Sequence, residues 1–389
     1  MNAPKLRFKE FNDEWISQKL FQLVEFSKGN ILAKADLDET GSYPCILYGQ
    51  LYTKYNEVIR EIYSKTNRNE NNIPKSKKGD VLIPSSGETP IDISTSSCIQ
   101  IDNVLIGGDI NILRPISCDG RFLSYLINNN KKTEIAKVAQ GHSVVHLYND
   151  NLKQVLINIP SIQEQKRISD TLELLDKKIE LQSKKIEDLK LFKKGLIQKI
   201  FSSNNLSEVQ IKDLGTIITG TTPSKENKNY WNGGIIAWIT PTDINYERDI
   251  SNSITSLTKE GLKKGRFVPK NSILVTCIAS IGKNAVIKVD GSCNQQINAI
   301  IPNNKFNSNY IYYLMEYISP YLQSIAGTSA TAIVNKETFE RIKVKVHNYN
   351  DQSRIDKYLS SVETKILLED KLLNKLIKLK KGLIQSMFV

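Results

Sequence analysis

The sequence predicts an α+β protein in which two strand-rich globular regions are separated by two long helices that pair as an antiparallel coiled coil. Three observations lead to this prediction. The hexapeptide KKGLIQ occurs twice, at 193–198 and at 380–385. Each copy lies near the end of a stretch whose leucines and isoleucines follow heptad spacing. The remaining two stretches, each about 150 residues and thus of normal domain size, hold many short β-type runs.

The duplication extends well beyond the hexapeptide. When 163–201 is aligned with 350–388, 16 of 39 positions are identical, so the chain contains an internal repeat. In both copies the apolar residues follow 4-3 spacing, which places them on one stripe of a helix. Polar residues interrupt the stripe at the same two places in each copy, namely Gln182 and Glu369, then Lys193 and Lys380.

Two such helices in one chain can bury their stripes against each other, which a single helix cannot do. The alternative is two independent helices, each packed on its own domain. Polar residues in a seam fix register and partner, so their matched positions favour a mutual pair. Pro160 is expected just before the first helix, and Gly195 and Gly382 are expected to end or kink the helices. An antiparallel pair in a duplicated chain would make the protein pseudo-two-fold symmetric.

These features divide the chain into four segments. We predict a first globular domain at 1–160, a central helical spacer at 161–203, a second globular domain at 204–350 and a C-terminal helical spacer at 351–389. The clearest β-type runs are 80–84, 104–114, 155–159, 235–240, 272–278 and 285–289. Helical patterns are fewer in the globular regions, as at 122–128 and 310–319. The two regions also resemble each other weakly, as in 79–87 against 271–282.

Composition points to a polyanionic partner and a reducing compartment. The net charge is +12, and the spacers are the most basic segments, with 10 basic and 6 acidic residues in 166–201. The five cysteines are scattered and form no CxxC pair, so neither disulfides nor a zinc ribbon is expected. No signal peptide and no membrane-spanning run is recognisable, and we therefore expect a cytoplasmic protein.

Motifs for catalysis are missing from the sequence. It holds no GxxxxGK[ST], GxGxxG, HExxH or GxSxG pattern. Cys277 and Cys293 have no histidine nearby, which argues against a thiol nucleophile. We therefore expect no catalytic residue, no bound cofactor and no metal in this chain, and the sequence favours binding over catalysis.

Polar loops are abundant instead. Thr219–Ser224 is rich in hydroxyls, and 294–298 holds four amide side chains in five residues. Asn and Gln amides pair bidentately with adenine edges, and Lys, Ser and Thr suit phosphates. Ordinary turn chemistry is the alternative explanation. Trp231 and Trp238 are expected in the core rather than stacked on bases.

Several motifs in order resemble the DNA-specificity subunits of type I restriction-modification systems, and the resemblance covers nearly the whole chain. The motifs are LRFKEF with EW (6–15), YGQLYTKY (48–55), LIGGDINILRP (105–115), PSIQEQKRI (160–168), GTTPSKENKNYWNGGIIAWITPTDI (220–244), SILVTCIASIGKNAVI (272–287), CNQQINAI (293–300) and the KKGLIQ endings. One departure is the second spacer, which begins HNYNDQSRI at His347 without the proline and EQ. From it we expect a looser helix start or an altered partner contact.

The resemblance implies that each globule is a target-recognition domain reading one half of a bipartite, asymmetric site in double-stranded DNA. The spacers would set the gap between the half-sites. Two methylation subunits would dock on the chain and methylate adenine N6 with S-adenosylmethionine. Restriction subunits would join through them and use ATP and Mg. The alternatives are a coiled-coil scaffold without DNA specificity, a nuclease with an unrecognised site, and a specificity subunit whose methyltransferase lacks a restriction partner.

The resemblance and the loop positions together give two sets of candidate residues. Those expected to contact DNA are Tyr48, Ser85, Ser86, His142, Ser143, Thr219, Thr221, Thr222, Ser224, Thr242, Ser280, Lys283, Asn294, Gln295, Gln296, Thr328 and Ser329. Those expected to dock partner subunits are Gln165, Arg167, Lys193, Lys194, Gln198, Gln352, Arg354, Lys380, Lys381 and Gln385. On this hypothesis KKGLIQ occurs twice because two equivalent partners need two equivalent docking ends.

Overall fold

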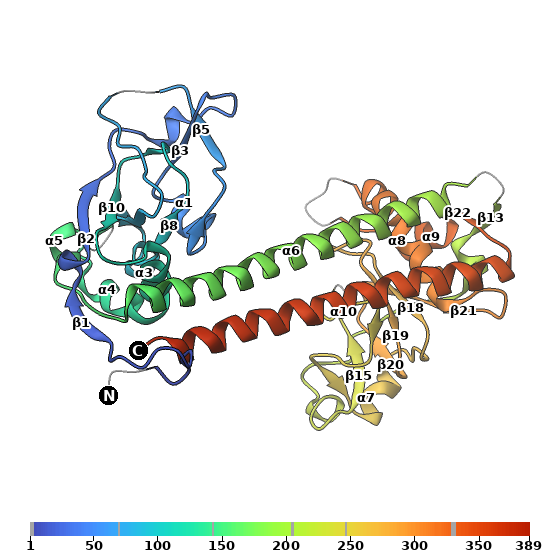
Figure 1. The fold of residues 1–389 in the computed structure, drawn as a ribbon. Coiled ribbons are helices and arrows are strands. Elements are labelled where there is room, and N and C mark those ends of the chain that lie inside the picture. Colours follow the sequence, from blue (N-terminus) through green and yellow to red (C-terminus); the bar gives the residue numbers. More distant parts are fainter. Residues whose placement is uncertain (1–3, 69–70, 142–143, 204–205, 246, 328–331) are drawn as a thin grey trace. The chain divides into compact units, whose positions relative to one another are not determined.

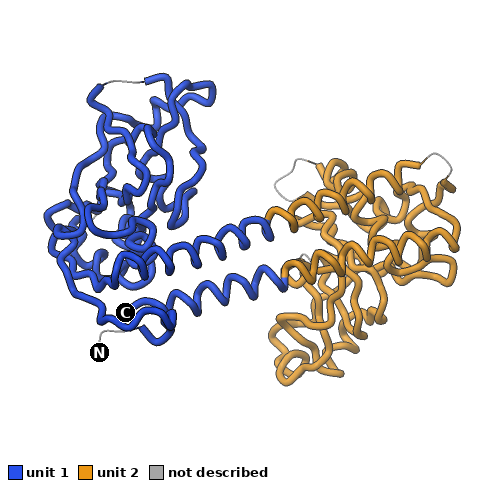
Figure 2. The backbone as a smooth tube through the Cα atoms, viewed as in Figure 1, with its two compact units in different colours: residues 1–183, 371–389 blue, residues 184–370 orange. Residues whose placement is uncertain are grey.

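The computed structural model describes residues 4–68, 71–141, 144–203, 206–245, 247–327 and 332–389. The chain forms two compact units, shown in Figure 2. Unit 1 comprises residues 1–183 and 371–389, and unit 2 comprises residues 184–370. Each unit holds one strand-rich globular part and one segment from each of two long helices, so the predicted α+β fold is confirmed.

The two long helices are α6 (Ile162–Phe201) and α10 (Tyr349–Met387), labelled in Figure 1. Their segments run antiparallel, as predicted. In unit 2, Lys185 pairs with Glu369 and Lys193 pairs with Glu363. Residue numbers therefore increase along α6 in the direction in which they decrease along α10. In unit 1, the first turns of α6 share a hydrophobic core with the last turns of α10.

Neither helix ends at its glycine, so of the two outcomes expected at Gly195 and Gly382 an end is wrong and a kink stays a prediction. A glycine inside a helix costs only about 1 kcal/mol relative to alanine. The turns beyond each glycine are held by burial of Phe201 in unit 2 and of Met387 in unit 1. Tertiary packing therefore outweighs the local preference.

The start of α10 is capped, in contrast to the looser start expected from its divergent sequence. The Asn348 side-chain oxygen accepts a hydrogen bond from the Asp351 backbone N–H at 3.0 Å, which is N-cap geometry. The buried Gln352 amide donates to the His347 carbonyl at 2.9 Å, as Gln165 does to the Pro160 carbonyl at the start of α6. Asn348 stands where α6 has Ser161, whose hydroxyl accepts the Glu164 N–H at 3.4 Å, so the cap is kept although the proline is missing.

The globular part of unit 1 is built from a five-stranded and a three-stranded sheet, with two small ribbons and short helices. The five-stranded order is β2 (Val24–Lys28), β10 (Ile110–Pro115), β6 (Val81–Pro84), β8 (Ser97–Ile99), β4 (Val58–Ile59). The three-stranded order is β5 (Ser64–Thr66), β3 (Tyr43–Ile46), β9 (Leu105–Ile106), and the ribbons are β1 (Ile16–Lys19) with β12 (Leu156–Ile159) and β7 (Ser86–Gly87) with β11 (Val145–His146). The helices are α1 (Gln50–Thr53), α2 (Pro90–Ile93), α3 (Gly120–Leu126), α4 (Lys132–Val138) and α5 (Asn149–Lys153), with single turns at Leu20–Gln22, Lys34–Asp36 and Ile127–Lys131.

The globular part of unit 2 repeats this plan. Its five-stranded order is β14 (Gly215–Thr219), β21 (Ile297–Pro302), β18 (Ile273–Thr276), β19 (Asn284–Ile287), β16 (Asp249–Ile250). Its three-stranded order is β17 (Ser256–Leu257), β15 (Ile236–Ile239), β20 (Gly291–Cys293), and its ribbon is β13 (Ser207–Gln210) with β22 (Lys343–Val346). The helices are α7 (Lys259–Lys264), α8 (Ser308–Ile325) and α9 (Lys336–Arg341), with single turns at Ile211–Leu214 and Lys228–Tyr230.

The strand pairings match between the units. In both five-stranded sheets only the last pair is parallel, β4 with β8 and β16 with β19. In both three-stranded sheets the central strand has one antiparallel and one parallel neighbour. Among the helices of the described residues, none has both the length and the apolar content needed to cross a membrane.

Candidate nucleic-acid interface

Several polar loops of unit 2 meet at one end of the five-stranded sheet. The backbone N–H of Gly220 donates to the Ile297 carbonyl at 3.0 Å, and that of Thr221 donates to the Cys293 carbonyl at 2.9 Å. The backbone N–H of Cys277, just after β18, donates to the Gln296 carbonyl at 2.8 Å. The loops after β14, β18 and β20 are therefore joined by main-chain bonds, which fixes their backbone.

Gly220 permits the closest of these approaches. A Cβ at this position would lie 2.2 Å from the Asn294 carbonyl oxygen and 2.3 Å from that of Cys293. Both distances are far inside van der Waals contact, so a side chain here would force the two loops apart. The glycine that opens the GTTPS stretch is thus required by the loop crossing.

Within this cluster some side chains satisfy each other, and amide NH₂ groups of the described residues remain available to a ligand. The Thr222 hydroxyl donates to Gln295 Oε1 at 2.5 Å, and both residues are exposed. Asn294 is buried and donates to Gln296 Oε1 at 2.9 Å. Among the described residues the Gln295 amide NH₂ has no acceptor, so it can donate to a ligand such as a base edge.

The two tryptophans support the loop rather than extending from it. The Trp238 indole N–H donates to the Thr221 carbonyl at 3.1 Å, and that of Trp231 donates to the Ser224 carbonyl at 2.9 Å. Their rings meet edge to face with centroids 5.0 Å apart. Trp238 is buried as expected, whereas Trp231 is only half-buried.

The other unit 2 candidates lie around the same loops. Thr219 donates through its hydroxyl to Asn298 Oδ1 at 2.7 Å and is half-buried. Thr242 and Ser224 are exposed, as are Ser280 and Lys283 between β18 and β19. Thr328 and Ser329 lie outside the described residues. The exposed candidates of unit 2 are therefore hydroxyls and one lysine, side chains that suit contacts to phosphates.

Unit 1 has the same loop crossing with different side chains. Gly29 takes the place of Gly220: its N–H donates to the Ile110 carbonyl at 2.8 Å, and a Cβ on it would lie 1.8 Å from the Gly107 oxygen. The loop between β9 and β10 is Gly107-Gly108-Asp109, where unit 2 has Asn294-Gln295-Gln296. The amide side chains of unit 2 thus have no counterpart in this loop.

The candidates predicted in unit 1 differ in accessibility. Tyr48 is exposed just after β3. Ser85 and Ser86 are buried, with Ser86 paired to His146 in the β7–β11 ribbon, so their hydroxyls lie beneath the surface. His142 and Ser143 lie outside the described residues.

Sequence reasoning missed a cationic and aromatic cluster in unit 1. The Tyr148 ring is 45% exposed and stacks on His146 with centroids 6.0 Å apart. Lys28 Nζ lies 5.7 Å from the centre of the same ring. An exposed aromatic face beside a cation is suited to nucleic acid. The sequence carries no local signal for this cluster because Lys28 and Tyr148 come from opposite ends of the domain.

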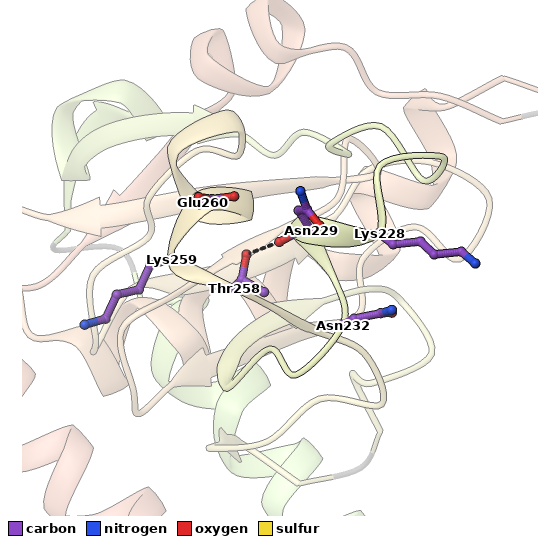
Figure 3. Close-up of a pocket in the computed structure, with 6 residues that line it drawn as sticks. All are labelled: Lys228, Asn229, Asn232, Thr258, Lys259 and Glu260. Atoms are coloured by element: carbon purple, nitrogen blue, oxygen red, sulfur yellow. Dashed lines mark hydrogen bonds between the residues drawn. The ribbon is translucent and has the colours of Figure 1, made fainter.

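A polar hollow in unit 2 was also missed. It has a volume of about 460 Å³ and is lined by Lys228, Asn229, Asn232, Thr258, Lys259 and Glu260. Figure 3 shows the two lysine side chains reaching outward on either side, while the Thr258 hydroxyl donates to the Asn229 carbonyl at 2.7 Å. The lining combines these two lysines with the Glu260 carboxylate, so the hollow is polar and carries charges of both signs.

The predicted docking residues fall into two groups. Six are exposed on the long helices, namely Arg167, Lys194, Gln198, Arg354, Lys381 and Gln385. The other four lie against their own unit. Gln165 and Gln352 are buried, and Lys193 and Lys380 are largely covered by acidic and aromatic side chains.

Burial suppresses the reactivity of the two cysteines predicted not to be nucleophiles. Burial raises the pKa of Cys277 to about 11 and that of Cys293 to about 12, so both thiols are protonated at neutral pH. Within the described residues, no group of three or more His, Cys, Asp or Glu side chains is arranged to hold a metal ion.

Comparison with known proteins gives a consistent picture. The model of the type I restriction modification DNA specificity domain matches residues 12–191 and 204–378. The specificity subunit of the type I restriction enzyme MjaIX from Methanocaldococcus jannaschii is 36% identical over 168 residues, which cover 42% of this chain and 38% of that subunit. The EcoR124I/EcoR124II specificity subunit from Escherichia coli is 28% identical over 270 residues, or 64% of this chain and 65% of that subunit. The chain thus spans less than two thirds of the length of both relatives.

Two solved structures share the fold. The S subunit of a type I restriction-modification system from M. genitalium superimposes with a TM-score of 0.67 at 17% identity, covering 100% of this chain and 99% of that one. A chain from a structure describing complex assembly and conformational transition of the type I R-M system gives a TM-score of 0.59 at 14% identity, covering 96% and 97%.

Proposed function

Because the chain belongs to the type I restriction-modification DNA specificity family, we propose that it is the non-catalytic subunit that selects the DNA sequence for such a system. Each globular part reads one half of a bipartite, asymmetric site in double-stranded DNA. The long helices pair as one pseudo-two-fold coiled coil, which sets the gap between the halves.

One observation carries this proposal. The two units have the same strand order and the same glycine crossing, yet the loop at that crossing is Asn294-Gln295-Gln296 in one and Gly107-Gly108-Asp109 in the other. A repeated framework with different loop side chains is what reading two different half-sites requires. In unit 2 the free Gln295 amide reads a base edge, most simply adenine.

Phosphate contacts come from the cations around these loops. Lys28 with Tyr148 serves unit 1, and Lys228 and Lys259 serve unit 2. Such contacts fix orientation and carry no sequence information, which suits their place outside the amide loop. The net charge of +12 favours the encounter with DNA.

The chemistry belongs to partner subunits in this proposal. Two methylation subunits dock on the chain through the exposed spacer residues and methylate adenine N6 with S-adenosylmethionine. Restriction subunits join through them and use ATP and Mg. The chain itself binds no cofactor in this proposal. It works in the cytoplasm, a reducing compartment that suits its five free cysteines.

The direct test is to co-express the chain with its methylation subunit in a methylation-free host and to map N6-methyladenine across that genome. A two-part motif with a fixed unspecified gap is the expected result. A complex that forms but leaves the DNA unmethylated would point to a scaffold. Addition of the restriction subunit then tells a complete system from a methyltransferase alone, because only the former cleaves unmethylated DNA.

A further inference from the structure

We propose that Lys193 and Lys380, the first lysines of the two KKGLIQ copies, are positioning residues that hold each globular part on the helices in the orientation needed to read its half-site. The inference rests on the proposed function and adds an internal role for two residues first considered as partner contacts. Its basis is a cluster of matching contacts around each lysine.

In unit 1 the cluster consists of Lys380, Glu57, Asp176 and Tyr125. Lys380 Nζ lies 2.7 Å from Asp176 Oδ1 and 3.0 Å from Glu57 Oε2. The same ammonium lies 5.6 Å from the centre of the Tyr125 ring, and the Tyr125 hydroxyl donates to Asp176 Oδ2 at 2.5 Å. One cation thus joins α10, α6 and two parts of the globular region.

In unit 2 the cluster consists of Lys193, Glu316, Glu363 and Tyr313. Lys193 Nζ lies 2.6 Å from Glu363 Oε1 and 2.8 Å from Glu316 Oε2. It lies 5.5 Å from the centre of the Tyr313 ring, and the Tyr313 hydroxyl donates to Glu363 Oε2 at 2.9 Å. Here the cation joins α6, α10 and the globular helix α8.

The lysine, one acid and the tyrosine correspond between the two clusters, whereas the second acid comes from different elements, Glu57 before β4 and Glu316 on α8. Lys193 and Lys380 are 187 residues apart, as are Asp176 and Glu363, and each tyrosine stands on the helix that packs beside its long helix. In each unit the lysine comes from the last turns of one long helix and the acid from the early turns of the other. The hexapeptide therefore recurs because each helix end must engage the globular part beside the other helix's start.

Each lysine is largely covered by the side chains around it. The Lys380 side chain is 19% exposed and that of Lys193 is 14% exposed. Burial acts to lower the pKa of Lys380, but Glu57 and Asp176 outweigh that effect and raise it. Removing the ammonium would leave two carboxylates facing each other in a partly desolvated site, so the elements they belong to would move apart.

In each unit a second cation also links the globular part to a long helix. Arg248 donates to the Ser360 hydroxyl at 2.7 Å and lies 3.2 Å from Glu363 Oε2, which ties the strand β16 region to α10. Arg60 is paired with Glu173 and so ties the β4 region to α6. The globular part is thus held to the long helix at two points, which restricts its rotation.

The test compares Lys380→Met and Lys193→Met in the complex with the methylation subunit. Methylation is measured on DNA carrying a single mismatch in either half-site. We expect Lys380→Met to lower discrimination by about tenfold in the half read by unit 1 only, and Lys193→Met to do so in the other half only, because a small misplacement of a reading surface has effects of that size. Lys378→Met and Lys190→Met, at exposed helix positions in the same units, are the matched controls.

Equal changes in both halves, or none, would overturn the positioning role, as would failure of Lys380→Arg to restore discrimination. If Lys380→Met does not assemble, Glu57→Gln removes one charge from the same cluster and must show the same half-site selectivity. A wild-type complex that methylates no bipartite motif would instead refute the proposed function, and this inference with it.

Discussion

Units 1 and 2 differ least where the long helices meet the globular parts and most at the loops. In unit 2, Phe201 packs on Tyr310 with ring centroids 5.3 Å apart. In unit 1, Phe388 packs on Phe122 at 5.2 Å. The loops at the glycine crossings share no side-chain chemistry. The comparison teaches that different residues pack the globular parts on the long helices and face the DNA. The loop side chains can therefore change without disturbing the packing.

The buried glutamines belong to the support. Gln165 Oε1 accepts the backbone N–H of Asp119 at 2.9 Å, and Gln352 Oε1 accepts that of Asn307 at 3.1 Å. Asp119 and Asn307 are the N-cap residues of α3 and α8. Each glutamine therefore links the first turns of a long helix to the start of the globular helix beside it.

Substitution of the terminal phenylalanines should have the largest effect. We expect Phe201→Ala to destabilise unit 2 by about 3–5 kcal/mol, because it removes a fully buried ring. Phe388→Ala should cost unit 1 less, because Phe201 also contacts Tyr317 and His347. Hydrogen exchange resolved by unit measures both, with the exposed Phe192→Ala as control. Loss of hydrogen-exchange protection in unit 1 for Phe201→Ala, or in unit 2 for Phe388→Ala, would contradict the matched packing.

The glutamine links should respond alike in both units. Gln165→Ala and Gln352→Ala each leave a buried backbone group unpaired, which costs about 1–3 kcal/mol. Urea unfolding followed by hydrogen exchange should show similar losses, in unit 1 for the first and unit 2 for the second. The exposed Gln163→Ala is the control. A large difference between the two losses of stability would show that the matched hydrogen bonds do not contribute equally to the two units.

Substitutions in the amide loop of unit 2 should change recognition of only one half-site. Removal of the amides in Asn294→Ala, Gln295→Ala and Gln296→Ala together should relax the half-site read by unit 2, and Gln295→Ala alone should lower base discrimination by about 1 kcal/mol. Competition binding with single-base variants of the methylation motif measures this. Unchanged specificity in both halves would remove these residues from the reading surface.

The smallest expected effect is a difference between the two units in how their stability depends on pH, and it comes from His347 in unit 2. Burial lowers the pKa of His347 below 6.5, although Asp351 acts to raise it. The neutral form is also favoured because Nδ1 lies 2.9 Å from the Tyr310 hydroxyl, which accepts the His347 backbone N–H and is free to donate to the ring. A histidine with a depressed pKa gives stability that is complete above pH 6.5 and is lost as the pH falls below it.

Unit 1 has the non-titrating Pro160 at the corresponding position. We therefore expect unit 2 to lose more stability than unit 1 between pH 7.5 and pH 5.5, as followed by thermal unfolding with hydrogen exchange at both values. His347→Gln should remove the difference. An unchanged difference in that variant would assign the effect to other groups.

Much of this organisation could be predicted from the sequence. Heptad spacing and the repeat predicted two long antiparallel helices, because an amphipathic stripe of that length must be buried against a partner. The β-type runs predicted the main strands, although the run at 104–114 is divided into β9 and β10 by a turn at Asp109, whose φ is 59°. Hydroxyl and amide loops around Gly220 were also predicted from local composition.

Only the tertiary structure decided which of those residues face inward. Lys193 and Lys380 look like solvated charges in a basic helix, and their acids Glu316 and Glu57 lie far away in sequence. Lys28 and Tyr148 meet because β2 and the segment after β11 are brought together by the domain fold. Local pattern fixes an element's type and length, since these depend on neighbours in the chain. Which charge is covered and which amide is left free depends on contacts between distant segments, and only folding brings those together.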